Sequence, residues 1–384
     1  MIEKLYYLEN LYNAFLTVRK ASGWKETTQR YEEDLLFHLV DLRDRLINHT
    51  YVPSIPKTFL YHERGKLRMI ESYTIDDRVV QSCFVNDIIV PLARKKVIYD
   101  NSASLKQRGT DHFRRRLEYH LNDFIKQYGD DGYLLKMDFT KYFDNIRHKE
   151  LIDVFRYLGL DEECIEFTNL LLELHRIDVS YMNDEEYANC MDAPFNSIEY
   201  ANIPVKLKTG KKFMEKSVGI GSQLAQVAGI IYPYRLDNYV KIVEGIKGYG
   251  RYMDDVGVIV HKKEDMKRIM ANMLSICKDL GIFVNMHKTQ IIPLRHRFTF
   301  LKTQYYIENG KKLVKIPDKG TFKREKRKLK KLKQRHTQHE ITDQQVEQTY
   351  FSWRGTIQTN YGEIRSLRNI DQVYYHLFKE DGYE

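Results

Sequence analysis

The stretch from Gly248 to Val260, Gly-Tyr-Gly-Arg-Tyr-Met-Asp-Asp-Val-Gly-Val-Ile-Val, constrains the fold more than any other part of the chain. Its adjacent carboxylates, Asp254 and Asp255, lie between short runs rich in aromatic and β-branched residues, which strands favour. The pattern predicts a β-hairpin with the acidic pair at its turn. Two neighbouring acids repel each other unless a cation neutralises them. Taken alone, however, such a pair is more often a solvated turn.

The composition describes a folded protein with a basic surface. The 384 residues are 42% hydrophobic and 30% charged, which is typical of globular domains. A net charge of +9 favours a polyanionic partner, most simply a nucleic acid, and 28 tyrosines supply surfaces for stacking bases. Four scattered cysteines argue against a zinc cluster or a disulfide framework. No apolar run approaches the roughly 20 residues that cross a bilayer. The sequence therefore predicts a cytoplasmic protein with no membrane partner.

Hydrophobic periodicity predicts a mixture of helices and hairpins. We expect helices in these segments: two within 1–50 with Leu35, Leu36, Leu39, Leu42, Leu46 and Ile47 on one face, then 75–98, a helix from Asp111, 149–175, 219–239, 264–280, a basic helix from Thr321, and a last helix after a capping box of Thr342 and Gln345. We expect hairpins in these segments: 58–70 with a turn at 63–65, 248–260, and 298–316 around Asn309-Gly310. Residues 176–217 are polar and irregular, which indicates a surface hairpin insertion.

A third acid joins the pair. Asp138 ends a short apolar strand predicted over 132–138, and acids at strand ends can converge at one place in a sheet. Three carboxylates there would hold two Mg²⁺ ions through oxygen ligands, and the absence of a Cys/His ligand set agrees with that metal. Two metals roughly 4 Å apart suit a displacement at phosphorus, because one lowers the pKa of the attacking hydroxyl and the other steadies the leaving oxygens.

These motifs, in this order, resemble the reverse transcriptase family. Tyr252-Met-Asp-Asp255 resembles the Y-x-D-D box of that family. Residues 137–146, Met-Asp-Phe-Thr-Lys-Tyr-Phe-Asp-Asn-Ile, resemble its first acidic motif in the bacterial group II intron and retroelement version. The resemblance covers about residues 50–307. It implies an α+β right-hand polymerase with fingers, an antiparallel-sheet palm and a helical thumb.

The resemblance implies roles for the residues around the three acids. Asp138, Asp254 and Asp255 would bind the two Mg²⁺ ions, for which Mn²⁺ could substitute. Phe139, directly after Asp138, is assigned to the same metal and substrate set. Phe143 falls where the family keeps an aromatic gate against the sugar 2′-hydroxyl. A bulky ring at that position excludes a ribonucleotide, because the extra oxygen would overlap it.

Other matching positions would bind the nucleotide and the nucleic acid. Lys66 and Arg68, on one face of a predicted strand, would neutralise the triphosphate. Lys288 would protonate or steady the departing pyrophosphate, with a solvated surface lysine as the alternative. Tyr252 would pack near the primer end, and Arg108 lies in a template-side loop.

One position departs from the usual family pattern. Many members have Pro-Gln-Gly before the helix, whereas this chain has Gly219-Ile220-Gly221. Ile220 and Gly221 are assigned to the substrate set, and Ile220 cannot hydrogen-bond as Gln does. The run from Ile220 to Gln226 is similar to that of reverse transcriptases from diversity-generating retroelements and antiphage defence, although Ala225 stands where the former usually have Ser. We hypothesise that Ile220 loosens discrimination at the templating base.

The basic helix from Thr321, with the C-terminal helix, resembles a thumb, and a charged solvated helix is the alternative. Lys326, Lys330 and Lys333 would contact duplex phosphates without reading bases. The expected domains are residues 1–130 for the N-terminal helices and fingers, 131–317 for the palm, and 318–384 for the thumb.

The sequence thus predicts an RNA-directed DNA polymerase that extends a primer 3′-hydroxyl with dNTPs. Its expected partners are an RNA template and a DNA or RNA primer, with a structured RNA or an accessory protein as further partners. An untemplated or protein-primed DNA polymerase and a scaffold with a lapsed active site remain as alternatives. No Cys/His endonuclease module or long extension follows the thumb, so we do not expect a self-sufficient mobile intron protein. A bacterial or phage mutagenic retroelement and an antiphage-defence system both remain open.

Overall fold

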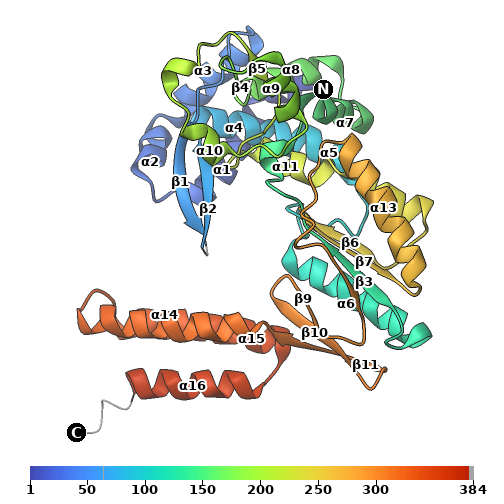
Figure 1. The fold of residues 1–384 in the computed structure, drawn as a ribbon. Helices are drawn as coiled ribbons and strands as arrows, with labels where there is room; N and C mark the ends of the chain where they lie inside the picture. Colours follow the sequence, from blue (N-terminus) through green and yellow to red (C-terminus); the bar gives the residue numbers. More distant parts are fainter. Residues whose placement is uncertain (64, 380–384) are drawn as a thin grey trace. The chain divides into compact units, whose positions relative to one another are not determined.

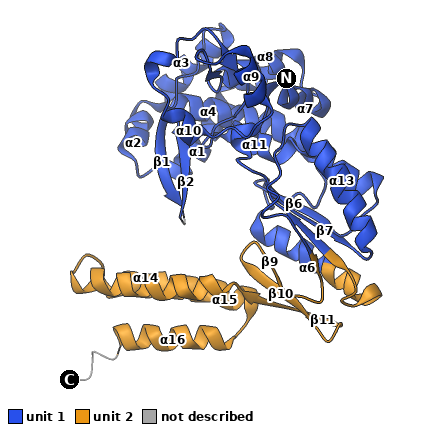
Figure 2. Ribbon diagram, viewed as in Figure 1, with its two compact units in different colours: residues 1–120, 134–291 blue, residues 121–133, 292–384 orange. Residues whose placement is uncertain are grey.

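The computed structural model describes residues 1–63 and 65–379 and separates into two compact units. The first unit contains residues 1–120 and 134–291, and the second contains residues 121–133 and those from 292 onward (Figure 2). None of the helices in the described residues combines the length and the apolar composition of a membrane span.

The first unit is rich in helices (Figure 1). Those wholly within it are α1 (Leu8–Ser22), α2 (Glu26–Glu33), α3 (Leu35–Ile47), α4 (Ile75–Cys83), α5 (Val90–Lys96), α7 (His148–Leu158), α8 (Glu162–Glu173), α9 (Asp184–Met191), α10 (Ser197–Ala201), α11 (Gln223–Ile231), α12 (Tyr234–Asn238) and α13 (Lys263–Asp279). α6 (Thr110–Tyr128) begins in this unit, and π-helical turns at Phe84–Ile89 and Tyr239–Val243 follow α4 and α12. α4 packs against α1 and α11, which confirms the predicted core helix after residue 75.

The first 50 residues contain three α-helices, whereas the sequence predicted two, because the chain breaks after α1 and again before α3. The apolar face predicted for α3 is only partly buried. Leu39, Leu42 and Leu46 are buried, while Leu36 and Ile47 are exposed. The buried leucines follow a spacing of three and four residues, and the two exposed side chains lie beside that narrow stripe on the helix surface.

The helix predicted over residues 219–239 is interrupted. α11 ends at Ile231 and α12 begins at Tyr234, with Pro233 between them. Proline lacks a backbone N–H and clashes with the preceding turn, so one continuous helix cannot form there. The predicted glycine motif lies ahead of α11 in a loop, and Ser222 caps that helix by accepting a hydrogen bond from the Ala225 N–H.

A four-stranded sheet carries the acidic residues. Its strands, in spatial order, are β6 (Tyr249–Tyr252), β7 (Asp255–Val260), β3 (Tyr133–Met137) and β8 (Gln290–Pro293). β6 and β7 pair antiparallel, with Tyr252 opposite Asp255. This confirms the predicted hairpin at 248–260 and the short strand that ends just before Asp138.

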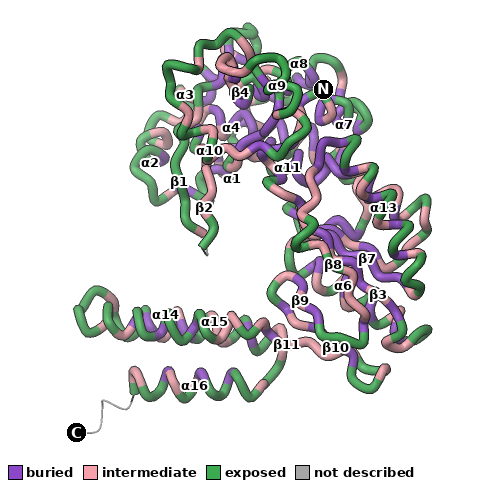
Figure 3. The backbone as a smooth tube through the Cα atoms, viewed as in Figure 1, coloured by how far each residue is buried: buried purple, intermediate pink, exposed green. Residues whose placement is uncertain are grey.

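A two-stranded hairpin precedes the core helices, as predicted. β1 (Lys57–Glu63) pairs antiparallel with β2 (Lys66–Ser72), and Arg64 in the predicted turn lies outside the described residues. β1 is exposed along nearly its whole length (Figure 3). Directly opposed residues share a face of the pair, so the register places Tyr61 beside Arg68.

The segment 176–217 is more ordered than the predicted irregular hairpin. Its two short strands, β4 (Ile177–Asp178) and β5 (Phe213–Met214), do pair antiparallel. Helices α9 and α10 lie between them, and a capping box of Asn183 and Glu186 begins α9. Sequence periodicity missed these helices because both are very short.

The second unit contains a small sheet and a helical part. Its elements are β9 (Phe298–Phe300), β10 (Thr303–Glu308), β11 (Lys312–Pro317), α14 (Lys319–Thr337), α15 (Asp343–Tyr361) and α16 (Arg365–Phe378), with β10 between β11 and β9. The Asn309-Gly310 hairpin is confirmed. The run predicted as one strand over 298–307 is two antiparallel strands, because Leu301 and Lys302 adopt positive φ and turn the chain.

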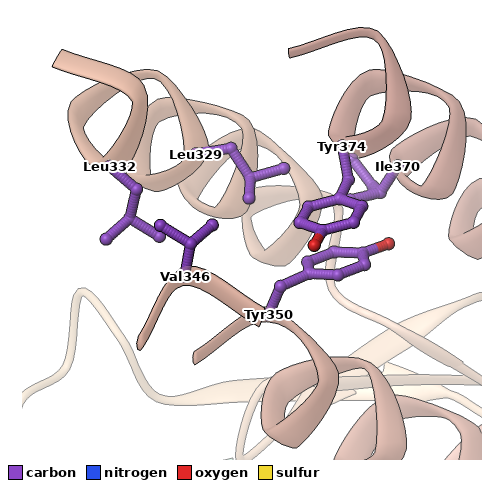
Figure 4. Packing of buried hydrophobic residues seen from close by; sticks show 6 residues of the cluster. All are labelled: Leu329, Leu332, Val346, Tyr350, Ile370 and Tyr374. Atoms are coloured by element: carbon purple, nitrogen blue, oxygen red, sulfur yellow. The ribbon is translucent and has the colours of Figure 1, made fainter. Parts of the chain in front are cut away.

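The three helices of the second unit share one apolar core. It contains Leu329 and Leu332 of α14, Val346 and Tyr350 of α15, and Ile370 and Tyr374 of α16 (Figure 4). The rings of Tyr350 and Tyr374 stack with centroids 4.0 Å apart. The predicted capping box of Thr342 and Gln345 begins α15. The sequence predicted α15 to be the last helix, and this is wrong. α16 follows it and supplies part of the core.

Replacing Glu325 by Gln is expected to stabilise the protein at neutral pH. Glu325 lies on α14, is 5% exposed, and its Oε1 has no hydrogen-bond partner in the described residues. Burial raises the pKa of this carboxyl. Its charge therefore opposes folding, and stability falls as pH rises through the folded-state pKa. We expect Glu325→Gln to raise the free energy of unfolding by about 1 kcal/mol at pH 7, and by less near pH 4.

Chemical denaturation at the two pH values measures this effect. Glu347→Gln, on the exposed face of α15, is the matched control, because its ion pair with Lys379 is solvated and contributes little. A Glu325→Gln variant that is less stable than the wild type at pH 7 would contradict the role assigned to burial.

Candidate active site

A cavity of about 520 Å³ lies in the first unit, where β3 ends beside the turn of β6 and β7. Residues from widely separated segments meet there. The cavity is lined by eight of the residues singled out from the sequence: Lys66, Arg68, Asp138, Phe139, Phe143, Ile220, Asp254 and Lys288. Asp255, Tyr252, Gly221 and Arg108 are not among its lining residues.

The acidic hairpin has a tight two-residue turn. Tyr252 pairs with Asp255, so Met253 and Asp254 form the turn itself. Met253 adopts φ +54°, the left-handed conformation that such hairpin turns require and that costs a non-glycine residue about 1 kcal/mol. A side chain of the same hairpin fixes the turn: Nη1 of Arg251 donates a hydrogen bond to the Met253 carbonyl at 3.0 Å.

Arg251 is the centre of a buried polar network that was not predicted from the sequence. It is 0% exposed, and Nε and Nη2 each donate to one oxygen of Asp237 at 2.8 Å. It also donates to the carbonyls of Gly229 and Ile230 on α11. The hydroxyl of Tyr249 donates to the same Asp237 carboxylate. These bonds tie the acidic hairpin to α11 and α12. The available sequence signal was the alternation of β6, which places Arg251 on the buried face with Tyr249.

Asp138 is fixed by the segment that follows α13. Its carbonyl accepts a hydrogen bond from the Asn285 N–H at 2.8 Å, and the next residue, Phe139, forms a bridge with Val284. The side chain is bound as well, since Nζ of Lys288 lies 2.8 Å from Oδ2 of Asp138. Asn285 also lines the cavity. The first acidic motif and the segment after α13 are thus in direct contact.

Phe143 begins a short 3₁₀ turn (Phe143–Asn145). The ring of Phe143 packs on α11. A Cβ atom placed at Gly229 would lie 2.9 Å from Cε1 of Phe143, closer than such atoms approach. The neighbouring Tyr142 hydroxyl donates to the Gly229 carbonyl at 2.9 Å. A glycine at this position of α11 is therefore required for the ring to sit where it lines the cavity.

The loop around Ile220 docks on β2. The Glu71 N–H donates to the Ile220 carbonyl at 2.8 Å, and the flanking residues Gly219 and Gly221 have φ of +63° and +144°. A Cβ atom at Gly221 would lie 2.1 Å from the Glu71 carbonyl oxygen. Both glycines are needed for this close approach. Gly221 thus contacts Glu71 and lies outside the cavity lining, while Ile220 is one of the lining residues.

Comparison with known proteins identifies the family. Residues 55–305 match the family described as "Reverse transcriptase (RNA-dependent DNA polymerase)". The chain belongs to the reverse transcriptase family. Members are RNA-directed DNA polymerases, which are nucleotidyltransferases, and the predicted α+β polymerase fold is confirmed. No curated protein sequence matches the chain.

Solved telomerase structures are similar to this chain. Apo telomerase from Candida tropicalis is 14% identical with a TM-score of 0.44, covering 70% of this chain and 48% of that one. Telomerase from Candida albicans in complex with a fragment of telomeric RNA is 12% identical with a TM-score of 0.45, covering 86% and 56%. The chain therefore spans about half the length of these telomerase chains.

The three acidic side chains disfavour each other's charge. Burial raises the pKa of Asp254, and Asp138 adds to the effect. Burial and the charge of Asp254 raise the pKa of Asp255 to about 6. A divalent cation would relieve this cost, and oxygen donors of this kind are what Mg²⁺ prefers. The residues therefore fit the metal chemically.

The acids are not arranged as a finished metal-ligand set. Among residues 1–63 and 65–379, no group of three or more His, Cys, Asp or Glu side chains is placed to hold a metal ion. The ammonium group of Lys288 lies beside Oδ2 of Asp138, where it neutralises part of the acidic charge.

Arg108 has a local role that the predicted template contact did not anticipate. Its Nη1 donates to the carbonyls of Ile98 and Asn101 at 3.0 and 2.9 Å, and its guanidinium lies over the ring of Tyr99. These contacts hold the loop between α5 and α6 in shape. Arg108 is only half-buried, so part of the group still faces solvent.

The predicted thumb lysines lie on α14 in the second unit. Lys326 and Lys330 are exposed, whereas Lys333 is half-buried with Nζ 5.8 Å from the centroid of the Phe378 ring. Leu329 and Leu332 of the same helix are buried in the core. α14 therefore combines a packed apolar face with a solvent-facing cationic one.

Proposed function

We propose that the chain extends the 3′-hydroxyl of a DNA or RNA primer with dNTPs opposite an RNA template. The observation that supports this most strongly is the single cavity shared by two of the acids, Asp138 and Asp254, and the cations Lys66 and Arg68. Acids that bind metal and cations that bind triphosphate must lie within one nucleotide's reach, and this cavity satisfies that requirement.

Asp138, Asp254 and Asp255, with Phe139 adjoining, would hold two Mg²⁺ ions or Mn²⁺ in their place. When bound, the ions supply a lower pKa for the attacking hydroxyl and neutralise charge at the phosphorus. Asp254 contributes from a turn whose backbone is fixed by Arg251. Its carboxylate therefore needs little reorganisation when substrate arrives.

The cationic side chains would bind the triphosphate. Arg68 lies 3.5 Å from Glu63 in an exposed ion pair, which contributes little and is readily exchanged for a phosphate. Lys66 lines the same cavity. Lys288 would leave Asp138 as the metals bind, and its Nζ would then donate a proton or a hydrogen bond to the departing pyrophosphate.

Phe143 would exclude ribonucleotides. Phe143 lines the cavity, and its ring is backed by α11 at Gly229, so the ring cannot retreat without moving that helix. A 2′-hydroxyl would overlap the ring, whereas a deoxyribose would fit beside it.

The remaining assignments concern the whole molecule. We infer fingers in residues 1–130, a palm in 131–317 and a thumb in 318–384, with the cationic face of α14 following duplex phosphates. The similarity of residues 220–226 to diversity-generating and antiphage-defence enzymes supports a cytoplasmic bacterial or phage system of one of these two kinds. A structured RNA or an accessory protein would complete it.

Primer extension with and without the RNA template separates this function from its alternatives. We expect product only when both template and primer are present. Equal synthesis without template would indicate an untemplated polymerase, and product covalently attached to the protein would indicate protein priming. Tight primer–template binding without any extension would indicate a lapsed scaffold.

Ile220→Gln is expected to make copying more accurate. Gln would offer a hydrogen bond to the nascent pair where Ile220 offers none, and one neutral hydrogen bond corresponds to about a fivefold change in selectivity. Sequencing of complementary DNA copied from a defined RNA measures the mismatch frequency. Ile242→Gln, at an exposed site, is the control. Equal error spectra for the wild type and Ile220→Gln would reject the role of Ile220.

Joint replacement of Lys326, Lys330 and Lys333 by Ala is expected to flatten the salt dependence of primer–template binding. Each lost phosphate contact lowers the slope of log K against log salt by about 0.7 to 0.9. Binding isotherms at several salt concentrations measure the slope. A control with the same charge change replaces Lys263, Lys267 and Lys278, which are exposed on α13. An unchanged slope in the α14 variant would show that the helix is merely solvated.

A further inference from the structure

The insertion at 176–217 has a hydrophobic core of its own. Ile177 and Val179 near β4, Phe195, and Met214 of β5 form a buried cluster. An isolated pair of two-residue strands would not be stable in water, so this cluster is what holds the segment in one shape. The insertion is therefore a packed element, in contrast to a loose surface loop.

A buried lysine fixes the part of the insertion that leads toward the cavity. Lys216 is 0% exposed, and its Nζ donates to the carbonyls of Cys190, Met191 and Ala193 at 3.3, 3.4 and 2.8 Å. These carbonyls end α9 and begin the connection to α10. Three charge-assisted hydrogen bonds to one short stretch strongly restrict its backbone.

Hydrogen bonds join this connection to the turn that contains Phe143. Asn145 accepts from the Phe195 N–H at 2.8 Å and donates to the Phe195 carbonyl at 3.3 Å. Ser197 donates its N–H and its hydroxyl to Oδ2 of Asp144 at 3.2 and 3.1 Å. Asp144 is 7% exposed, so the two bonds from Ser197 are the compensation for burying its charge.

The C-terminal end of the insertion is also hydrogen-bonded to the turn that contains Phe143. The Val218 N–H donates to the Phe143 carbonyl at 3.2 Å, and the Ser217 N–H donates to the Ile146 carbonyl at 2.9 Å. The backbone on both sides of the proposed gate is thus hydrogen-bonded to the insertion or to its immediate end.

The insertion also reaches the cavity directly. Ser197 and Ile198 line it together with Lys66, Phe143 and Asp144. α10, which begins at Ser197, packs against β2, the strand that carries the triphosphate-binding cations (Figure 1). The insertion therefore closes the gap between the turn of Phe143 and the β1–β2 hairpin.

We propose that residues 195–198 of the insertion form a wall of the nucleotide-binding site and hold the Phe143 turn in place, so that the insertion takes part in selecting the sugar. This rests on the polymerase function proposed above. A steric gate discriminates only if the ring cannot yield, because a ring that shifts by an ångström admits the 2′-hydroxyl. Ser197 is accordingly a positioning residue that acts through Asp144, while Ile198 contacts the nucleotide.

Single-nucleotide incorporation by Ser197→Ala tests the proposal. The variant loses the hydroxyl bond to Asp144, and a hydrogen bond to a charged group corresponds to about a tenfold effect. We expect the KM for a dNTP to rise and the preference for a dNTP over the matching ribonucleotide to fall, each by about tenfold, with kcat at saturating dNTP little changed. Ser197→Thr keeps a hydroxyl and should restore both values.

A second variant and a control separate selection from folding. Ile198→Ala removes wall surface without touching Asp144, and it should raise the KM for a dNTP on its own. Glu185→Ala changes an exposed residue of α9 and should behave as the wild type. Thermal melting of every variant accompanies the kinetics.

The outcomes distinguish this proposal from the proposed function. Wild-type extension with unchanged KM and sugar preference in both Ser197→Ala and Ile198→Ala would overturn the role of the insertion and leave the polymerase standing. A lower melting temperature with a lower kcat, but with the sugar preference intact, would likewise overturn it and leave a purely structural role. Absence of templated extension by the wild type would overturn both.

Discussion

Asp254→Asn is expected to lower the rate of nucleotide addition by about a thousandfold or more. The substitution keeps the size of the side chain and removes one of the negative charges that would bind the metals. Asp254 lines the cavity and sits in the turn fixed by Arg251, so no nearby acid can take its place without rebuilding the hairpin. Single-turnover extension of a primer on an RNA template measures the loss.

The same variant separates catalysis from stability. Burial raises the pKa of Asp254, so its charge opposes folding when no divalent cation is bound. Asp254→Asn should therefore melt at the same temperature as the wild type or higher in the presence of a chelator. Asp255, with a pKa of about 6, should make the wild type less stable as pH rises from about 4 to 6, since a raised carboxyl pKa has this sign.

An exposed aspartate supplies the control for both measurements. Asp153, on α7, forms a solvated ion pair with Arg156 at 3.7 Å, and Asp153→Asn should leave the rate and the melting temperature unchanged. Retention of more than a tenth of the wild-type rate by Asp254→Asn would remove this residue from the proposed metal site.

Arg251→Ala is expected to lower the free energy of unfolding by about 3 to 5 kcal/mol. The change leaves the carboxylate of Asp237 buried without its bidentate partner and withdraws donors from three carbonyls, including that of Met253. Loss of the Met253 contact also frees the acidic turn, so activity should fall further than stability alone explains. Urea denaturation and primer extension below the melting transition measure the two effects.

A double-mutant cycle shows whether Arg251 and Asp237 act as a unit. If they do, combining Asp237→Asn with Arg251→Met should lower the free energy of unfolding by much less than the sum of the two single changes. The double variant leaves no buried charge without a partner. Arg235→Ala breaks an exposed pair with Asp279 and should cost less than about 1 kcal/mol. Additive costs for Arg251 and Asp237 would contradict the network.

Local chemistry explains which parts of the site were predictable. The hairpin at 248–260 is encoded by strand-favouring residues on both sides of two acids, and its register follows from the turn itself. Asp138 was identifiable because it ends a short apolar strand. Eight of the residues singled out from the sequence line one cavity, and most of them were identified because short motifs resemble those of the family.

The unpredicted parts depend on long-range partners. An arginine in a strand is normally read as a surface residue, and only the fold shows that Asp237 and the α11 carbonyls surround Arg251. Ser197 contacts Asp144 across 53 sequence positions inside a segment whose polarity indicated a loop. The requirement for glycine at position 229 likewise arises from the ring of Phe143, which no local pattern reveals.

The most direct test of the polymerase assignment is single-nucleotide incorporation by the wild type on four RNA templates that differ only in the templating base. We expect addition of the complementary dNTP on each template when Mg²⁺ is present, poor addition of the matching ribonucleotide, and no addition with a chelator or in Asp254→Asn. Incorporation that ignores the templating base, or that persists in Asp254→Asn, would contradict the RNA-directed, metal-dependent site proposed here.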